Sequence, residues 1–535
     1  MKRILQYKFA IIAGLAIILL YFFLRVYNLT ILPIFVDEAI YIRWAQVMQA
    51  ESTLRFLPLS DGKQPLFMWT VIPFLKIFPD PLFAGRMVSV VTGFGTLVGI
   101  FLLTLYLFKK PWIALIAALI YAVSPFAVFF DRMALVDSML SMFGVWILLL
   151  GVVTARKLRL DAAMLTGFAL GGGLLTKSPA LFYSLLLPLT VIFAPVVKRV
   201  KVWSINYKNI AKFIGLLSIV YAIGYAMYNI LRLGPNFHLI GERNQDYVFP
   251  LSHILTNPKD PFIFYIDRIK EWLWMLGPNG LLILFVIGGS LALIRFPRES
   301  SILLAWAVVP ILVLAEFAKV ITARYILFSL PPLIVLASLP FLFKNRFLNP
   351  ITKVALLLLF VVHALVIDYR LITDPEKAPL PQSERSGYLE EWTAGTGIRE
   401  VAEFIRSEYQ KEPNVKIVIG TEGFFGALPD GLQMYLSNYP EITIIGTGLS
   451  FKEVPTSLVE SKVFGNKTYL VVNSSRFNEK FKVNDPNELG LALIASYPKA
   501  KRARTDTHEY IWYGERDYLY LFEVTEDAIF PKSRT

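Results

Sequence analysis

The 535-residue sequence contains no cysteine and only four histidines. The absence of cysteine excludes a disulfide framework and a thiolate metal site, although it does not assign a redox compartment. The histidines, His238, His253, His363 and His508, show no ligand spacing, so a histidine metal site is not expected. Charged residues make up only 17% of the chain, which differs from the balance of an ordinary water-soluble domain.

Long apolar stretches account for that shortage of charge, since 56% of the residues are hydrophobic. A helix needs roughly 20 mainly apolar residues to cross a bilayer, and such stretches recur from residue 9 to about residue 369. The N-terminal one lacks a small-residue cleavage site and is long enough to span, so we interpret it as a retained helix. The pattern predicts about eleven spans: 9–26, 84–108, 111–130, 135–155, 162–176, 180–197, 210–231, 279–295, 301–316, 322–343 and 351–369.

The remainder of the chain predicts a soluble α/β domain. Residues 396–409 have apolar side chains at helical spacing, and VKIVIG, EITIIG, TYLVVN and YLYLFEV resemble strands. The glycine-rich GTEGFFGALPDG matches neither a phosphate-binding loop nor a nucleophile elbow, so catalysis is not placed there. The fold class is therefore a polytopic α-helical membrane protein with a membrane domain over 1–370, a linker over 371–395 and a soluble domain over 396–535.

The net charge of +13 is interpreted as a signal of orientation rather than of nucleic-acid binding, because the basic residues cluster in alternate connections between spans. These connections are expected to be cytoplasmic. They carry Lys109 and Lys110; Arg156, Lys157 and Arg159; Lys198, Arg199, Lys201, Lys208 and Lys212; Arg295 and Arg298; Lys344, Arg346 and Lys353. After an odd number of spans, the C-terminal domain falls outside the cell membrane.

The outer connections contain ionisable residues at the edges of apolar helices, where they are costly and usually face a partner or a wet cavity. They occur in FVDEAIYIRW, DGKQPLFMW, FFDRMALVDSML, LLTKSPALF and AEFAKVITARY. We expect these groups to converge on one cavity. The alternative is that they mark helix ends at the lipid headgroups.

Such a set could transfer a sugar from a polyprenyl phosphate to a hydroxyl group. Asp37 and Glu38 follow the first span, and one could take the acceptor proton while the other orients the acceptor or is structural. The outer-side cations Lys63, Arg132, Lys177 and Arg324 could hold the leaving phosphate. Asp137 could bind sugar hydroxyls or orient an arginine, or simply favour the N-terminus of its helix. A divalent cation at Asp37 or Glu38 remains open.

These residues resemble the motifs of the GT-C superfamily, specifically the protein O-mannosyltransferase and lipid A aminoarabinose transferase group. The motifs are DE (Asp37, Glu38), GKQPL (Lys63, Pro65), RVS (Arg86), RxxLVDS (Arg132, Asp137), TKS (Lys177) and ARY (Arg324, Tyr325). The resemblance covers roughly residues 1–370, and the order of the motifs is its strongest part. It departs at Gly62 and Gln64, where the aminoarabinose transferases have an acidic residue and a proline, and the soluble domain lacks β-trefoil repeats.

The resemblance implies an inverting transfer of a mannose- or pentose-like sugar from a polyprenyl monophosphate donor. Asp37 best matches the base, and the lysines and arginines surround the donor phosphate, with Asp137 and Tyr325 at the sugar or acceptor. The acceptor could be a lipid, a glycan or a protein. Two other classes have similar features: a transporter or flippase of lipid-linked sugars, which is expected to show internal repeats that this sequence lacks, and a receptor, which would not need these acids and cations.

Overall fold

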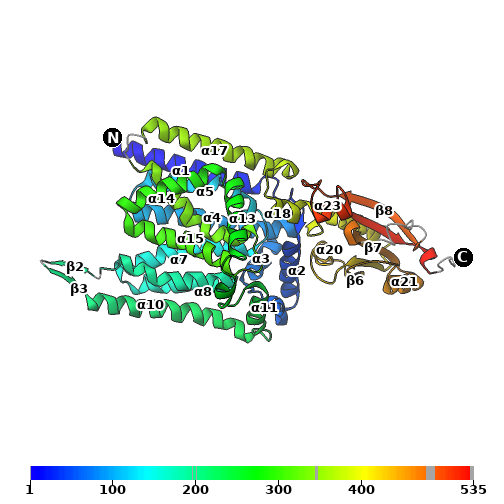
Figure 1. Ribbon diagram of the computed structural model, residues 1–535. Coiled ribbons are helices and arrows are strands. Elements are labelled where there is room, and N and C mark those ends of the chain that lie inside the picture. Colours follow the sequence, from blue (N-terminus) through cyan, green and yellow to red (C-terminus); the bar gives the residue numbers. More distant parts are fainter. Residues whose placement is uncertain (1, 196, 201, 344–347, 477–488, 530–535) are drawn as a thin grey trace. The chain divides into compact units, whose positions relative to one another are not determined.

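The computed structural model describes the chain except residues 1, 196, 201, 344–347, 477–488 and 530–535. Lys201, Lys344 and Arg346 of the expected cytoplasmic set lie outside the described residues. The chain forms two compact units (Figure 1). Unit 1 comprises residues 1–29, 51–70 and 86–381, and unit 2 comprises residues 30–50, 71–85 and 382–535.

Unit 1 is helical. Its principal helices are α1 (Lys2–Val26), α4 (Pro81–Phe108), α5 (Pro111–Ala122), α6 (Pro125–Asp131), α7 (Val136–Lys157), α8 (Leu160–Thr176), α9 (Leu181–Leu186), α10 (Tyr207–Tyr228), α11 (Leu239–Tyr247), α12 (His253–Thr256), α13 (Phe262–Met275), α14 (Asn279–Arg295), α15 (Pro297–Phe317), α16 (Leu330–Ser338) and α17 (Pro350–Thr373). Helix α3 (Leu66–Ile77) and the start of α4 cross the unit boundary. A short hairpin pairs β2 (Val197–Val200) with β3 (Val202–Ile205).

The prediction of a polytopic membrane protein is confirmed. Within the described residues, seven helical segments are long and apolar enough to cross a bilayer, and up to nine if each of two bent pairs is one span. The bent pairs are α5 with α6, at 60°, and α13 with α14, at 105°. The two other expected spans, 162–176 and 180–197, correspond to α8 and to the apolar segment Ser178–Phe193, which are shorter than 18 residues.

Small residues let the helices of unit 1 approach one another closely. Figure 1 shows α7, α8 and α10 side by side, and α8 packs against both of the others. At the α8–α10 contact, a Cβ on Gly167 would come within 2.8 Å of the Ile223 Cβ, and one on Gly171 within 2.5 Å of the Met227 sulfur. Close backbone approach of this kind is typical of helix packing in membranes.

Unit 2 is built on a five-stranded sheet in the order β6-β5-β7-β9-β8. Its elements are β1 (Ile34–Phe35), α2 (Val36–Ala50), α18 (Gln382–Arg385), η9 (Ser386–Glu390), β4 (Ala394–Gly395), α19 (Ile398–Lys411), β5 (Ile417–Glu422), α20 (Asp430–Tyr435), β6 (Ile442–Gly448), α21 (Thr456–Val463), β7 (Lys467–Asn473), η10 (Ser474–Arg476), β8 (Leu491–Pro498), α23 (His508–Tyr513) and β9 (Tyr518–Val524). Strands β6, β5 and β7 are parallel, whereas β9 is antiparallel to both β7 and β8.

Side chains alternate across this sheet as strand geometry requires. Val418 of β5 and Leu470 of β7 join a core cluster with Leu458 of α21. On the other side, Tyr469 of β7 packs edge-on against Phe404 of α19 at 6.0 Å between ring centroids. Helices therefore cover both faces, and the expected C-terminal α/β domain is confirmed.

The segment before the second apolar stretch is also part of unit 2. Ile34 and Phe35 of β1 pair antiparallel with Gly395 and Ala394 of β4, and α2 packs against α20. The compact unit thus includes residues that the sequence assigned to the membrane domain, and it begins again at residue 382, inside the expected linker. The linear division at residues 370 and 395 stays a prediction.

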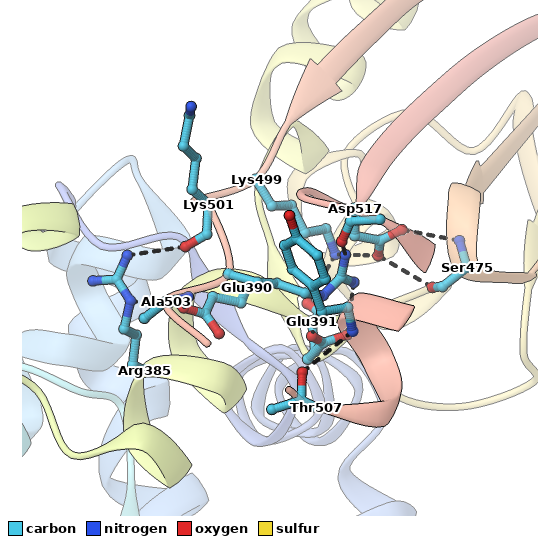
Figure 2. Close-up of polar contacts among 12 residues, drawn as sticks. Arg385, Glu390, Glu391, Ser475, Lys499, Lys501, Ala503, Thr507 and Asp517 are labelled. Atoms are coloured by element: carbon cyan, nitrogen blue, oxygen red, sulfur yellow. Dashed lines mark hydrogen bonds and ion pairs between the residues drawn. The ribbon is translucent and has the colours of Figure 1, made fainter. Parts of the chain in front are cut away.

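A buried polar network ties the strands of unit 2 to the segment that precedes them (Figure 2). The Lys499 ammonium lies 3.6 Å from an Asp517 carboxylate oxygen and donates to the Glu391 carbonyl. Asp517 also accepts from the backbone and hydroxyl groups of Ser475. Burial lowers the pKa of Lys499, while Asp517 opposes that effect. Each buried charge therefore has partners, as a low-dielectric interior demands.

Candidate active site

A cluster of charged and aromatic side chains in unit 1 joins three of the predicted motifs. The Lys177 ammonium donates to Asp137 at 2.7 Å and lies 4.0 Å from the centroid of the Tyr325 ring. Arg324 lies over the same ring, at 5.4 Å. Asp137 belongs to the first turn of α7, Lys177 caps the C-terminus of α8, and Arg324 and Tyr325 lie in the first turn of the 3₁₀ segment η6 (Ala323–Ser329). Four predicted site residues are therefore brought together, and we call them the Lys177 cluster.

The local chain conformation explains why Lys177 can reach Asp137. Lys177 follows the last residue of α8 as its C-terminal cap and has an extended backbone, so its side chain leaves the helix axis. Asp137 is only 4% exposed, whereas the Lys177 side chain is 22% exposed. One cation of the cluster therefore remains accessible while its carboxylate partner is enclosed.

The loop that carries Lys63 also reaches this region. The Gln64 side-chain amide donates to the Ser178 hydroxyl at 2.9 Å, which links GKQPL to TKS. Lys63 forms an ion pair with Asp61 at 3.1 Å, and Asp61 in turn lies 3.5 Å from Arg243 of α11. Gly62 has a left-handed φ of 65°, and a Cβ there would come within 2.6 Å of the Arg243 Cβ.

The fourth predicted cation, Arg132, has different surroundings. It is 1% exposed, and its terminal nitrogens donate to the carbonyls of Leu24, Arg25, Tyr27 and Asn28, at the C-terminal end of α1. These are the contacts of a residue that caps a helix. None of these contacts brings Arg132 into the Lys177 cluster, and its phosphate role stays a prediction.

The two predicted carboxylates begin α2 in unit 2 and differ in their surroundings. Glu38 is fully buried, and its carboxylate accepts from the backbone N–H of Phe35 at 2.9 Å. A glutamate at the third helical position that binds the capping residue's N–H is half of a capping box. Asp37 is half-buried. The helix start therefore uses Glu38, and Asp37 is the more accessible acid.

No group of three or more metal-binding side chains occurs in the part of the chain that the structure describes. A divalent cation held by Asp37 or Glu38 therefore has no third protein carboxylate or histidine among the described residues, and such a cation stays a prediction. Asp37 and Glu38 belong to unit 2, whereas all four predicted cations, Asp137 and Tyr325 belong to unit 1.

Sequence reasoning missed a second charged group, formed by Arg25 and Asp131. Both side chains are fully buried and form an ion pair at 2.9 Å. Arg25 also donates to the carbonyls of Ala122 and Tyr121, where α5 breaks before α6, and Ser138 donates to Asp131. Arginine at the end of an apolar span and aspartate beside Arg132 were the available signals. Asp61 was also missed, although it lies only two positions before Lys63.

Part of the chain matches a family of mannosyltransferases, and its fold matches a solved structure. Residues 62–225 match the family described as dolichyl-phosphate-mannose-protein mannosyltransferase. No curated protein matches the sequence significantly. The fold is similar to that of ArnT from Cupriavidus metallidurans, with a TM-score of 0.55 to the apo structure and 0.50 to the structure bound to undecaprenyl phosphate. Each match has 14% identity and covers 96% of this chain and 98% of that chain.

A third match is the apo oligosaccharyltransferase of Archaeoglobus fulgidus, with a TM-score of 0.49, 13% identity, and coverage of 86% of this chain and 69% of that one. The order of motifs in the sequence, the family match and the ArnT likeness agree. The chain therefore shares its fold with ArnT, and residues 62–225 carry the match to the mannosyltransferase family.

Proposed function

We propose that the protein transfers a sugar from a polyprenyl monophosphate donor to an acceptor hydroxyl, at the outer face of the cell membrane. The observation that carries the proposal is the Lys177 cluster, in which side chains from three separate segments meet. Cations at the edge of an apolar helix bundle suit a lipid-linked phosphate, whose polyprenyl chain stays in the bilayer.

In this mechanism the cations act on the leaving group. Lys177, Lys63 and Arg324 offset the charge that develops on the phosphate as the bond from the anomeric carbon to the phosphate oxygen breaks. The electron pair of that bond leaves with the polyprenyl phosphate. Asp137 holds Lys177 and, with Tyr325, contacts the sugar. The ion pair of Lys63 with Asp61 balances the charge of Lys63 before the donor binds.

Asp37 is the proposed base. It accepts the proton of the acceptor hydroxyl while the hydroxyl oxygen bonds to the anomeric carbon, on the face opposite the leaving phosphate, which inverts the configuration. Two observations support Asp37 over Glu38: Asp37 is half-buried, and Glu38 is fully buried with its carboxylate on the Phe35 N–H. A mannose- or pentose-like sugar is part of the proposal.

Incubation of the purified chain with radiolabelled polyprenyl phosphate sugars tests it. Loss of label from the donor, with its appearance on an acceptor, is the expected result. Movement of intact donor across a vesicle bilayer without cleavage would instead identify a transporter. The matched variants are Asp137→Asn/Lys177→Gln, which removes both charges of the pair together, and Lys157→Gln, which removes an exposed cation at the end of α7.

A further inference from the structure

We propose that unit 2 carries a carbohydrate-binding site at the carboxyl ends of β5 and β7, beside the start of α2, and that this site holds a sugar-bearing acceptor. The site assignment rests on unit 2 alone. Its role in catalysis rests on the proposed function.

The topology of the sheet singles out this edge. The chain passes from β5 to β6 on one side of β5, and then to β7 on the other side, and all three strands are parallel. The connections that leave β5 and β6 therefore run in opposite directions across the sheet. In open α/β sheets, ligands bind outside the carboxyl ends of the strands at such a switch point.

The segment after β5 exposes apolar side chains at this edge. Phe424 is 71% exposed and Phe425 is 47% exposed, directly after the strand ends at Glu422. Leu449, which follows β6, is 60% exposed, and the Gly423 N–H donates to the Gly448 carbonyl. The ends of β5 and β6 therefore present an apolar surface whose exposure to water is unfavourable in free energy.

Polar groups lie next to this surface, at the end of β7. The Glu422 carboxylate accepts from the backbone and side-chain amides of Asn473 and from Arg476. The Arg476 guanidinium lies 4.6 Å from the centroid of the Trp392 ring. Among the described residues, the side-chain oxygen of Asn473 accepts no hydrogen bond, although it is buried. An unmatched buried acceptor of this kind gains from a donor such as a hydroxyl group.

This combination fits a neutral sugar. The apolar C–H face of a pyranose packs on aromatic rings, while its hydroxyls reach carboxylate, amide and guanidinium groups at the rim. Glu422 and Arg476 form an ion pair at 3.3 Å, so their charges offset each other. A site for a phosphate or another anion would need surplus positive charge, and a site for an acyl chain would not need the polar rim.

The same edge contacts the helix of the proposed base. The rings of Phe425 and Trp44 lie 5.7 Å apart. A Cβ on Gly426, whose φ is 127°, would lie 3.3 Å from the Val36 Cγ2. On the β4 side, the Val36 N–H donates to the carbonyl of Thr393, the residue after Trp392. Asp37 follows Val36 directly, so an acceptor sugar on this surface is held beside the start of α2.

A binding experiment with the full chain in nanodiscs tests the site without requiring turnover. The protein is labelled with a fluorophore and applied to an array of hexose and pentose mono- to trisaccharides, with serine- and threonine-containing peptides as competitors. We expect binding to at least one saccharide class, and about tenfold weaker binding in Phe424→Ala. The matched control is Phe464→Ala, an aromatic residue of the same unit that is 82% exposed after α21.

The outcomes separate the two proposals. Absence of saccharide binding, or equal binding by Phe424→Ala and the wild type, would overturn the carbohydrate site. Displacement by the peptides would replace it with a peptide site. If saccharides bind and Phe424→Ala weakens them, but no donor sugar is ever transferred, the site stands and the glycosyltransferase proposal fails.

Discussion

Asp131 and Asp137 lie six residues apart in the sequence, and each forms an ion pair, but the two pairs have different environments. Asp131 and Arg25 are fully buried, and Arg132 places its guanidinium on four backbone carbonyls. Asp137, six residues later, pairs with a lysine whose side chain is 22% exposed. The first group completes the ends of α1 and α5, whereas the second leaves an accessible cation. A motif that contains both kinds of residue therefore does not by itself separate structure from chemistry.

The same contrast between an enclosed and an accessible charge occurs at the start of α2, where Glu38 is buried and Asp37 is half-buried. It predicts the largest effect of a substitution on turnover. Asp37→Asn keeps the size of the half-buried side chain but removes its proton affinity, so turnover should fall by about 10²–10⁴-fold. Donor binding should persist, because the proposed phosphate cations are unchanged. Rapid-quench turnover with labelled donor and equilibrium donor binding measure the two quantities.

Glu38→Gln is the matched comparison for Asp37→Asn. Glutamine still offers an oxygen to the Phe35 N–H, so its effect on turnover should be smaller. Near-normal activity in Asp37→Asn would eliminate Asp37 as the base, and small, equal effects from both variants would mean that neither carboxylate takes the proton.

The second prediction contrasts Arg132 with Lys177. Arg132→Met leaves the carbonyls at the end of α1 without their donor, and should destabilise the protein by roughly 3 kcal/mol. Asp137→Asn/Lys177→Gln should fold normally and bind donor about tenfold or more weakly. Thermal unfolding in detergent and donor binding distinguish these results. A well-folded Arg132→Met with weakened donor binding would instead favour the phosphate role of Arg132.

A third prediction extends the comparison to unit 2, where Lys499 is buried and contacts Asp517 and the Glu391 carbonyl (Figure 2). Lys499→Met leaves Asp517 buried without its cation, which should reduce the free energy of local opening of β7 and β9 by about 3 kcal/mol. Hydrogen exchange of the full chain measures this. The exposed Lys452→Met is the control, and equal protection in both variants would show that the buried pair contributes little.

The sequence predicted the elements with strong local signals. Apolar runs located the spans, short runs rich in β-branched and aromatic residues located β5, β6, β7 and β9, and helical spacing located α19. The bend between α5 and α6 is not visible in hydropathy, because the apolar composition continues across it. The Arg25 contacts that satisfy the freed carbonyls of α5 join residues almost a hundred positions apart.

For the candidate site, residue type and membrane position singled out Lys177, Asp137, Arg324 and Tyr325, which lie together in the structure, but they did not reveal which charges the fold enclosed. Glu38 and Arg132 could not be distinguished from Asp37 and Lys177, since capping contacts depend on backbone geometry. Nor could the sequence show that β1 pairs with β4, about 360 residues later. That pairing places the first acidic residues in the same unit as the C-terminal sheet.

The smallest expected effect concerns Asp430, which anchors the segment after β5 by accepting from the Gly426 N–H at 2.7 Å. Burial raises the pKa of Asp430, against the opposing effects of that N–H and of Arg43. The folded state therefore keeps the proton to higher pH than the unfolded state. The stability that this bound proton contributes to the folded state is complete below the ordinary pKa of an aspartate, and it is lost as pH rises through the pKa of Asp430 in the folded state. Local protection of residues 423–430, corrected for intrinsic exchange, should accordingly fall as pH rises above the ordinary pKa of an aspartate. Asp430→Asn retains an acceptor for Gly426 but cannot ionise, so its profile should be flatter. Parallel profiles for the wild type and Asp430→Asn would show that another group controls this segment.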